Sequence, residues 1–441
     1  MYDWVFALIL MFGGITGLLF LGIPVVFAFI ALNVLGAYIF LGGEAGIIQM
    51  VRNMRPSVSQ YSLVPICLFV LMGELLLHTG IATRSIAAID RMISRVPGRL
   101  SIVAILGGTT FATLSGSSVA NAAIVGKTLI PEMRQRKYHP VVSVGPVAAV
   151  GGIAVLIPPS ALAVMLGSVG KIPINELLIA GLVPGMMMML GFLAYVLIRC
   201  KLNPEIAPSY DVERLSFAER FIPFLRDVVP LFFIFVAVVG SMLAGIATPT
   251  ESAAVGVIAS AIAAAVYRAL SIPKMFAALS ETLKFSGMIL FIICCSSTFS
   301  QILSFSGATH QLAQAVTSNE ALTASMIVLC MLLLLLILGC FMESASMIML
   351  TMPIFLPILI ALQVDMIWFG VMMMIALEIG LCTPPFGMLL FVVQGVLKGT
   401  YTLPVIYKSV TPYLVIELLV LFIIFMFPWT VSWLPALFSA G

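Results

Sequence analysis

Apolar stretches of about 20 residues follow one another along almost the whole of this 441-residue chain. A helix of that length matches the hydrocarbon core of a bilayer, and the chain has room for about a dozen such segments. Hydrophobic residues make up 62% of the chain and charged residues only 9%, against about a quarter charged in an ordinary soluble domain. The pattern predicts an all-α polytopic membrane protein and excludes a soluble enzyme, a disordered chain and a nucleic-acid binder.

Polar residues, glycines and prolines divide the chain into segments. We expect ordinary spans over 4–21, 22–42, 62–79, 176–198, 228–247, 250–267, 285–305 and 410–435. An interfacial stretch is expected over 43–61, an amphipathic arm with arginines at helical spacing over 80–99, and a polar turn over 306–320. No cleavable signal peptide is expected, because the first basic residue is Arg52. The seven cysteines show neither metal-ligand spacing nor a disulfide framework.

The two halves of the chain resemble each other. Three prolines recur 226 positions later, so that Pro131, Pro158 and Pro159 match Pro357, Pro384 and Pro385. The order of the spans, one interrupted apolar run and one long run with a Pro-Pro pair recur as well. The first predicted repeat covers 1–198, with a hairpin over 100–133 and a broken helix over 141–170. A cytoplasmic linker is predicted over 199–227. The second predicted repeat covers 228–441, with a hairpin over 321–362 and a broken helix over 366–397.

Lysine and arginine are distributed unequally between the loops. The arm 80–99, the loop 134–139 and the linker 199–227 are basic, which predicts that they are cytoplasmic. The equivalent loops of the second half, 306–322 and 358–366, contain no lysine or arginine and are expected outside. Each interrupted run then enters and leaves the membrane on one side as a re-entrant helical hairpin, and the two hairpins enter from opposite faces. Such an inverted-topology repeat is typical of a secondary transporter.

The first hairpin is interrupted by small and hydroxyl-bearing residues, SGSSVANAA at 115–123. Small residues also let membrane helices approach closely, which is the purely structural explanation. Non-helical backbone at membrane depth is tolerated only beside protein or a water-filled cavity, so we favour a binding role for this tip. The hydroxyls of Ser115, Ser117 and Ser118 and the amide of Asn121 then offer oxygen ligands to a cation. The helix after the tip points its positive end inward, which suits an anion.

The two Pro-Pro pairs interrupt apolar runs of about 30 residues, which as straight helices of about 45 Å would be too long for one span. Proline has no N–H and deprives the carbonyl four residues before it of a donor. The affected carbonyls are those of Ala154 and Val155 before Pro158 and Pro159, and of Gly380 and Leu381 before Pro384 and Pro385. Carbonyls freed at membrane depth suit sodium. A simple proline kink is the alternative, and its recurrence in both repeats favours the binding role.

Five glutamates fall within the predicted membrane segments, Glu74, Glu251, Glu343, Glu378 and Glu417. Intramembrane acids are costly and usually functional. We favour a functional role for Glu343 at the second hairpin tip and for Glu378 just before the second Pro-Pro pair. Glu251 follows Thr-Pro-Thr at the start of a span, where an acid suits a helix N-terminus. The roles of Glu74 and Glu417 stay open, and the three histidines form no cluster.

Six strings spread from end to end carry a resemblance to a known family. They are LSGSSVANAA at 114–123, LIPPS at 156–160, AGLVPG at 180–185, ATPTESAAVG at 247–256, GCFMESASM at 339–347 and EIGLCTPPFG at 378–387. Over essentially its whole length the chain resembles the large membrane subunit of the tripartite ATP-independent periplasmic (TRAP) transporters, within the ion-transporter superfamily. Two positions depart from the family pattern, since Asn121 stands where the family often has an acid and Leu389 where it often has asparagine.

The resemblance implies an elevator-type sodium symporter, a multi-pass protein of the bacterial inner membrane. A scaffold of outer spans would hold a mobile domain made of the hairpins and broken helices. Sodium sites are implied at each pair of hairpin and broken helix, with sodium as the coupling ion and no cofactor. The implied positions are Ser115, Gly116, Ser117, Ser118, Asn121, Ala154, Val155 and Pro158 in the first half, and Glu343, Ser344, Ser346, Gly380, Leu381, Thr383, Pro384 and Gly387 in the second.

The resemblance also implies two protein partners. A soluble periplasmic binding protein would deliver a small organic acid, and a small four-span membrane subunit would brace the scaffold. That subunit is expected to be a separate chain, since no fused one precedes residue 1. The main alternative is a stand-alone ion-coupled carboxylate symporter or antiporter of the same superfamily. An intramembrane hydrolase using Ser115 and Lys127 is disfavoured, because the two lie across a hairpin tip and Lys127 is expected to snorkel towards the cytoplasmic interface.

Overall fold

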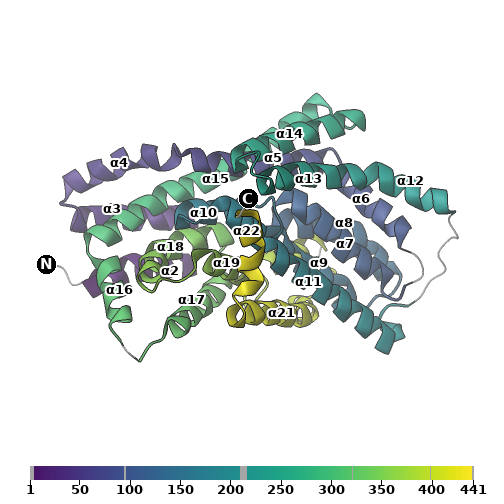
Figure 1. The fold of residues 1–441 in the computed structure, drawn as a ribbon. Coiled ribbons are helices and arrows are strands. Elements are labelled where there is room, and N and C mark those ends of the chain that lie inside the picture. Colours follow the sequence, from purple (N-terminus) through teal and green to yellow (C-terminus); the bar gives the residue numbers. More distant parts are fainter. Residues whose placement is uncertain (1–3, 94–95, 209–215, 320, 398, 440–441) are drawn as a thin grey trace.

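The computed structural model describes residues 4–439 except 94–95, 209–215, 320 and 398, and these described residues form helices without any strand. Most of the helices lie in two layers (Figure 1). The first layer, which we call the frame layer, packs α5 against α14 and α15, and α15 against α3 and α4. It consists of α3 (Val25–Phe40), α4 (Glu44–Val58), α5 (Val64–His78), α13 (Val229–Leu243), α14 (Pro249–Val266) and α15 (Ile272–Phe305).

The second layer, which we call the hairpin layer, is built around α9 and α19. It consists of α7 (Arg99–Ser115), α8 (Ser118–Gln135), α9 (Pro140–Leu156), α10 (Ala161–Gly170), α11 (Ile174–Leu202), α17 (Ala324–Gly339), α18 (Ser344–Ala361), α19 (Met366–Leu381), α20 (Met388–Val396), α21 (Leu403–Met426) and α22 (Trp429–Ser439). The helices α7, α8 and α21 pack on α9, and α17 packs on α19. Apart from Glu378 on α19, both central helices are almost entirely apolar, and they are buried along nearly their whole length, as a helix in the middle of a bundle should be.

The remaining elements lie at the ends and between the spans. They are α1 (Trp4–Leu8), the π-helical turn η1 (Ile9–Gly13), α2 (Gly14–Phe20), η2 (Tyr61–Leu63), α6 (Ile81–Met92), η3 (Pro204–Ile206), α12 (Phe217–Asp227) and α16 (Ala308–Thr317). In Figure 1, α6 and α12 reach the right-hand end of the molecule and α16 lies at the left-hand end. The polar stretch 306–320, expected as a turn, thus contains a helix.

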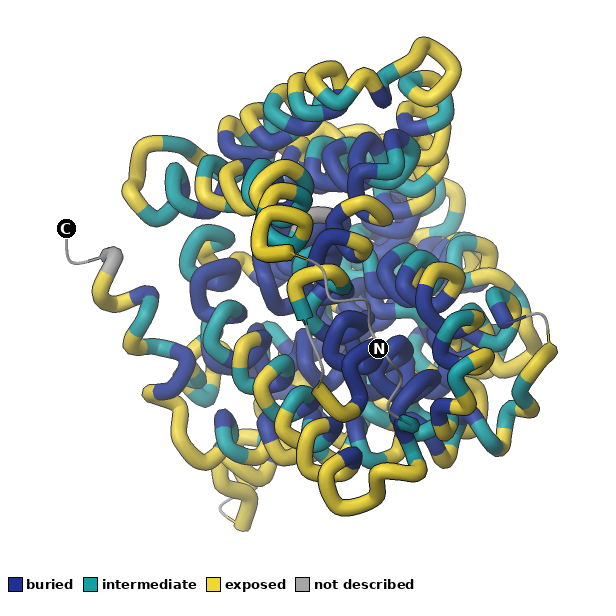
Figure 2. The backbone as a smooth tube through the Cα atoms, turned by 90° about the vertical axis from the view of Figure 1, so that its right-hand side faces the viewer, coloured by how far each residue is buried: buried dark blue, intermediate teal, exposed yellow. Residues whose placement is uncertain are grey.

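Seven of the described helical segments are long and apolar enough to cross a membrane, or eight if α9 and α10 count as one bent span. A further five apolar helices are shorter. Buried residues are concentrated in the centre of the molecule and exposed residues at its periphery (Figure 2). On α13 and α14 large apolar side chains point outward, among them Phe232, Phe233, Ile258 and Ile262. An apolar outer surface of this kind is what a helix needs in lipid.

Two expected spans have different bounds in the structure. The span expected over 285–305 is the second part of α15, which begins at Ile272. Lys274, Glu281 and Lys284 interrupt the apolar pattern, but lysine and glutamate are good helix formers and the helix continues through them. The segment expected over 410–435 is two helices, α21 and α22, because Pro428 keeps Phe427 out of the helical conformation.

Four helix pairs are interrupted by short breaks, and these breaks position the candidate site. The pairs are α7 with α8, α9 with α10, α17 with α18, and α19 with α20. The two helices of α7–α8 pack against each other, and so do those of α17–α18, whereas α9 and α10 meet at a bend of 45°. In Figure 1, α7 and α8 occupy the right-hand half of the molecule and α17 and α18 the left-hand half.

Candidate functional site

The first hairpin tip is a two-residue break between α7 and α8. Gly116 has a φ of 58°, in the left-handed region where glycine fits without strain. Ser117 is extended and caps α8, since its Oγ accepts a hydrogen bond from the Ala120 amide at 3.3 Å. A Cβ placed on Gly116 would lie 3.0 Å from the carbonyl oxygen of Pro159. The first tip therefore contacts the first Pro-Pro break.

The first Pro-Pro break covers residues 157–160, between α9 and α10. The carbonyls of Ala154 and Val155 face proline nitrogens four residues on, which carry no hydrogen to donate. Ser160 caps α10, since its Oγ accepts a hydrogen bond from the Ala163 amide at 3.2 Å. The first tip and the first break thus meet at one junction, where Gly116 lies against Pro159 and Ser160.

The second hairpin tip covers residues 340–343, between α17 and α18. Glu343 is the N-cap residue of α18 but does not cap the helix with its side chain. Its Oε1 instead accepts a hydrogen bond from Ser346 Oγ at 3.0 Å. The thiol of Cys340 donates to the carbonyl oxygen of Pro384 at 3.5 Å. The second tip therefore contacts the second Pro-Pro break, as the first tip contacts the first.

Two glycines bring the second hairpin and the second broken helix into backbone contact. A Cβ on Gly339 would lie 2.5 Å from the Cα of Gly380, and a Cβ on Gly380 would lie 2.6 Å from the Cα of Gly339. Real Cβ atoms do not approach so closely, so any side chain at either position must push the two helices apart. This seam of two glycines is the small-residue packing that membrane helices use for close approach.

The second break differs from expectation at one carbonyl. The expectation that Pro384 leaves the Gly380 carbonyl without a donor is wrong, because this carbonyl accepts a hydrogen bond from the Thr383 amide at 3.0 Å. The last turn of α19 tightens to i→i+3 bonding there, which is common at helix ends. Thr383 Oγ1 donates to the Ile379 carbonyl at 2.6 Å and keeps its lone pairs as an acceptor. Gly387, with a φ of 39°, precedes α20.

One contact joins the two halves of the chain and was not predicted. Ser118, at the start of α8, donates from its Oγ to Glu378 Oε2 on α19 at 2.9 Å. Asn121 lies one turn further along α8 and donates from Nδ2 to the carbonyl of Val150 on α9 at 3.1 Å. The first tip is therefore bound to both central helices of the hairpin layer. No local sequence pattern signals a pair separated by 260 positions.

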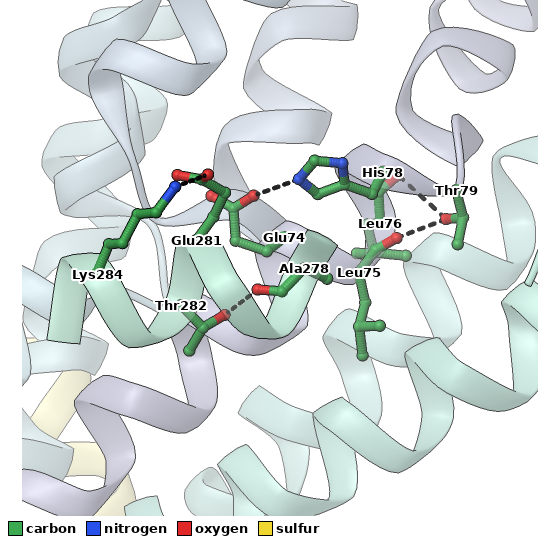
Figure 3. A network of polar contacts seen from close by, with 9 residues as sticks. All are labelled: Glu74, Leu75, Leu76, His78, Thr79, Ala278, Glu281, Thr282 and Lys284. Carbon is green, nitrogen blue, oxygen red and sulfur yellow. Dashed lines mark hydrogen bonds and ion pairs between the residues drawn. The ribbon is translucent and has the colours of Figure 1, made fainter. Parts of the chain in front are cut away.

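Glu74 of α5 lies beside Glu281 of α15, and each of them is paired within its own helix (Figure 3). His78 Nε2 lies 3.3 Å from Glu74 Oε2, and on α15 Lys284 Nζ lies 2.7 Å from Glu281 Oε1. Glu74 also lines a cavity of about 30 Å³ together with Ser115, Gly116 and Ser117 of the first tip, among other residues. A space of that size holds about one water molecule. Glu74 thus connects the frame layer to the first tip.

The other charged residues singled out from the sequence lie apart from the tips. Glu251 forms a capping box with Thr248, in which each residue's backbone amide donates to the other's side chain, and this fits the helix N-terminus role. Lys127 and Arg134 line a larger cavity of about 530 Å³ between α8 and the end of α20. No group of three or more His, Cys, Asp and Glu side chains is arranged to hold a metal within the described part of the chain.

Several known proteins of similar sequence are named as transporter permeases, not as enzymes. The sialic acid TRAP transporter large permease protein of Vibrio cholerae is 31% identical, over 96% of this chain and 97% of its own length. The C4-dicarboxylate TRAP transporter large permease protein of Pseudomonas aeruginosa is 33% identical, over 83% of this chain and 84% of its own length. Among solved structures, the YdaH transporter of Alcanivorax borkumensis matches with a TM-score of 0.62 at 14% identity, covering 89% of this chain and 91% of that one.

The structural likeness shows a shared fold, and the sequence match shows the family. The family model of the tripartite ATP-independent periplasmic transporter DctM component matches residues 12–430, which is nearly the whole chain. The apolar helices agree with a multi-pass membrane protein. The chain belongs to the family of TRAP transporter large permease subunits.

Proposed function

We propose that this permease drives uptake of a small organic acid by sodium symport across the bacterial inner membrane. The observation that carries the proposal is the contact of each hairpin tip with a Pro-Pro break, Gly116 with Pro159 and Cys340 with Pro384. Irregular backbone at membrane depth, built from two broken elements at a time, is the usual construction of an ion and substrate site in secondary transporters.

The groups at these junctions fit sodium. They are hydroxyl, carbonyl and carboxylate oxygens, which suit a hard cation better than nitrogen or sulfur would. At the second tip the Ser344 hydroxyl is buried and, within the described residues, has no hydrogen-bond partner, so an oxygen is left for a ligand. The first sodium would be held by Ser115 and Ser117 with the carbonyls of Ala154 and Val155, since the Ser118 hydroxyl is already bonded to Glu378. The second would be held by Glu343, Ser344, Ser346 and Thr383. Bound sodium would supply the driving force.

An elevator movement is the transport step that fits the two layers best. Both tips and both breaks belong to the hairpin layer, and the frame layer contains none of them. We infer that the hairpin layer carries sodium and substrate past the frame layer, and that the two halves are inverted repeats with hairpins entering from opposite faces. The placement of α7–α8 and α17–α18 in opposite halves of Figure 1 supports this inference.

Two partners complete the proposed system. A periplasmic binding protein would deliver the substrate, and a small membrane subunit would brace the frame layer. Relatives named for sialic acid and for C4-dicarboxylates, both organic acids, support a carboxylate-bearing substrate. The first tip adds a physical argument, because α8 begins there and its free amides face the tip, where they favour negative charge.

Sodium titration of uptake tests the proposal. In proteoliposomes containing the complete system, Ser117→Ala and Thr383→Ala should each raise the sodium concentration for half-maximal uptake by about tenfold, since each removes one oxygen ligand. Thr411→Ala is the matched control, because Thr411 makes the same hydroxyl bond to the carbonyl four residues back, at 2.8 Å, outside the junctions. If the sodium titration curves of both site variants overlay that of the parent while substrate is still transported, the tips do not bind the coupling ion.

A further inference from the structure

Two carboxyl groups lie buried side by side in the middle of the hairpin layer. Glu378 on α19 and Glu417 on α21 are each only 1% exposed. Both face Gly152 of α9, since the position that a Cβ would take there is 3.3 Å from Glu417 Oε1 and 3.9 Å from Glu378 Oε2. Two oxygens within 4 Å of one point are less than 8 Å apart. The missing side chain at Gly152 leaves the two acids facing one small volume.

When both acids are ionised, no positive side chain of the described residues balances the charge of this pair. Over the described residues, neither glutamate forms an ion pair, and the one hydrogen bond to their side chains comes from Ser118. Glu378 Oε1 and Glu417 Oε2 are buried and have no partner in that part of the chain. Two like charges in a low-dielectric interior repel strongly, and each is also costly to remove from water. One positive charge placed between them would relieve both costs.

A further buried oxygen, from a residue that is not an acid, lies one turn from Ser118 on α8. Asn121 is three positions after Ser118 on α8, so the two side chains share one face of that helix. Its Nδ2 is fixed on the carbonyl of Val150, two residues before Gly152, and its Oδ1 is fully buried with no partner among the described residues. Together with Ser118 and the two glutamates, Asn121 completes a set of oxygen donors, the kind that binds a hard cation.

We propose that Glu378 and Glu417, with Ser118 and Asn121, form a sodium site inside the hairpin layer. The site differs from those at the hairpin tips because it joins α8 of the first half to α19 and α21 of the second. A cation there would tie the first hairpin to the last long helix across the α9 surface. The proposal rests on the proposed sodium-coupled transport and adds one ion to it. It is tested by sodium binding alone, so its failure can be distinguished from a failure of the transport proposal.

Counting bound sodium ions tests the site directly. The purified full chain in detergent is equilibrated with radioactive ²²Na⁺, with choline chloride keeping the ionic strength constant. Glu417→Gln should bind one sodium fewer than the parent, because it keeps the shape of the side chain but removes its charge. Glu205→Gln is the control, an exposed glutamate in η3 outside the hairpin layer, and should bind as many as the parent.

Thermal unfolding separates a cation site from a merely structural acid. In sodium-free alkaline buffer, where the acids are ionised, Glu417→Gln should unfold at a higher temperature than the parent, because it removes a buried charge that has no counter-ion, and sodium should stabilise it less. A structural role predicts the opposite, a lower temperature with an unchanged response to sodium. If Glu417→Gln does not fold, Ser118→Ala, which removes one neutral ligand, should weaken sodium binding at this site about tenfold.

Three outcomes overturn the proposal. The first is an unchanged sodium count in a folded Glu417→Gln variant. The second is a variant whose stability loses its dependence on pH but keeps its sodium count, which would assign a proton to the pair. The third is unweakened sodium binding in Ser118→Ala. None of these measurements involves uptake, so a transporter with normal sodium-driven uptake and an unchanged count would reject this site alone.

Discussion

Gly380 is the position where a single methyl group should do the most damage. A Cβ there would lie 2.6 Å from the Cα of Gly339, and backbone cannot move aside as the end of a flexible side chain can. We expect Gly380→Ala to destabilise the folded state by about 1–3 kcal/mol, the usual cost of overpacking. The midpoint of thermal unfolding of the purified protein should fall accordingly, and uptake should fall with it.

The matched control is Gly287→Ala, in the middle of α15. A Cβ on Gly287 meets nothing within 4 Å, and the residue is helical. Alanine is the better helix former by about 1 kcal/mol, so the unfolding midpoint should stay or rise. Equal losses in the two variants would show that the seam between Gly339 and Gly380 tolerates a side chain and that the close contact is not required.

The orientation of the two hairpins is a prediction at the level of elements. Gln135 ends α8 and Ser318 directly follows α16. The basic loop after α8 is expected in the cytoplasm and the loop around Ser318, free of lysine and arginine, in the periplasm. In a background without the seven native cysteines, Gln135→Cys and Ser318→Cys should react with an impermeant maleimide from opposite sides. Labelling of both from one side would contradict the inverted repeat.

The elements that the sequence predicted well are those governed by local chemistry. Glycine, proline and serine signal a break wherever they occur, and the structure interrupts the chain at Gly116 and at both Pro-Pro pairs. The first half of α15 was missed because hydropathy does not distinguish a polar stretch of helix from a loop. Ser118 and Glu378 could be paired only in three dimensions, and the position of Glu417 against Gly152 follows from helix packing that no periodicity encodes.

The dependence on partners is a prediction for the whole molecule. The described loops between the spans are short, and no large domain outside the helical layers is present in the described residues to capture dilute substrate. We therefore expect negligible uptake by this chain with sodium alone, and uptake at least about tenfold faster once the small subunit and the substrate-loaded binding protein are added. Proteoliposomes with each component omitted in turn make the measurement.

A single result decides between the two transporter hypotheses. Sodium-driven uptake of a free organic acid by the purified chain, at the rate of the complete system, would favour a stand-alone carrier and reject the tripartite mechanism. The empty-vesicle blank and a potassium gradient of equal size are the controls, since they measure leak and membrane potential without sodium coupling.

The 34 residues of α15 form one unbroken helix, about 51 Å long at 1.5 Å per residue. The hydrocarbon core of a bilayer is about 30 Å thick, and a helix without an internal proline cannot fold back to fit it. The helix α15 must therefore tilt or extend beyond the hydrocarbon core. Its tilt angle depends on the length of the acyl chains around it. The lipid composition of the host membrane therefore influences the tilt of α15. A thicker bilayer makes this helix more upright and changes the tilt of the helices packed on it.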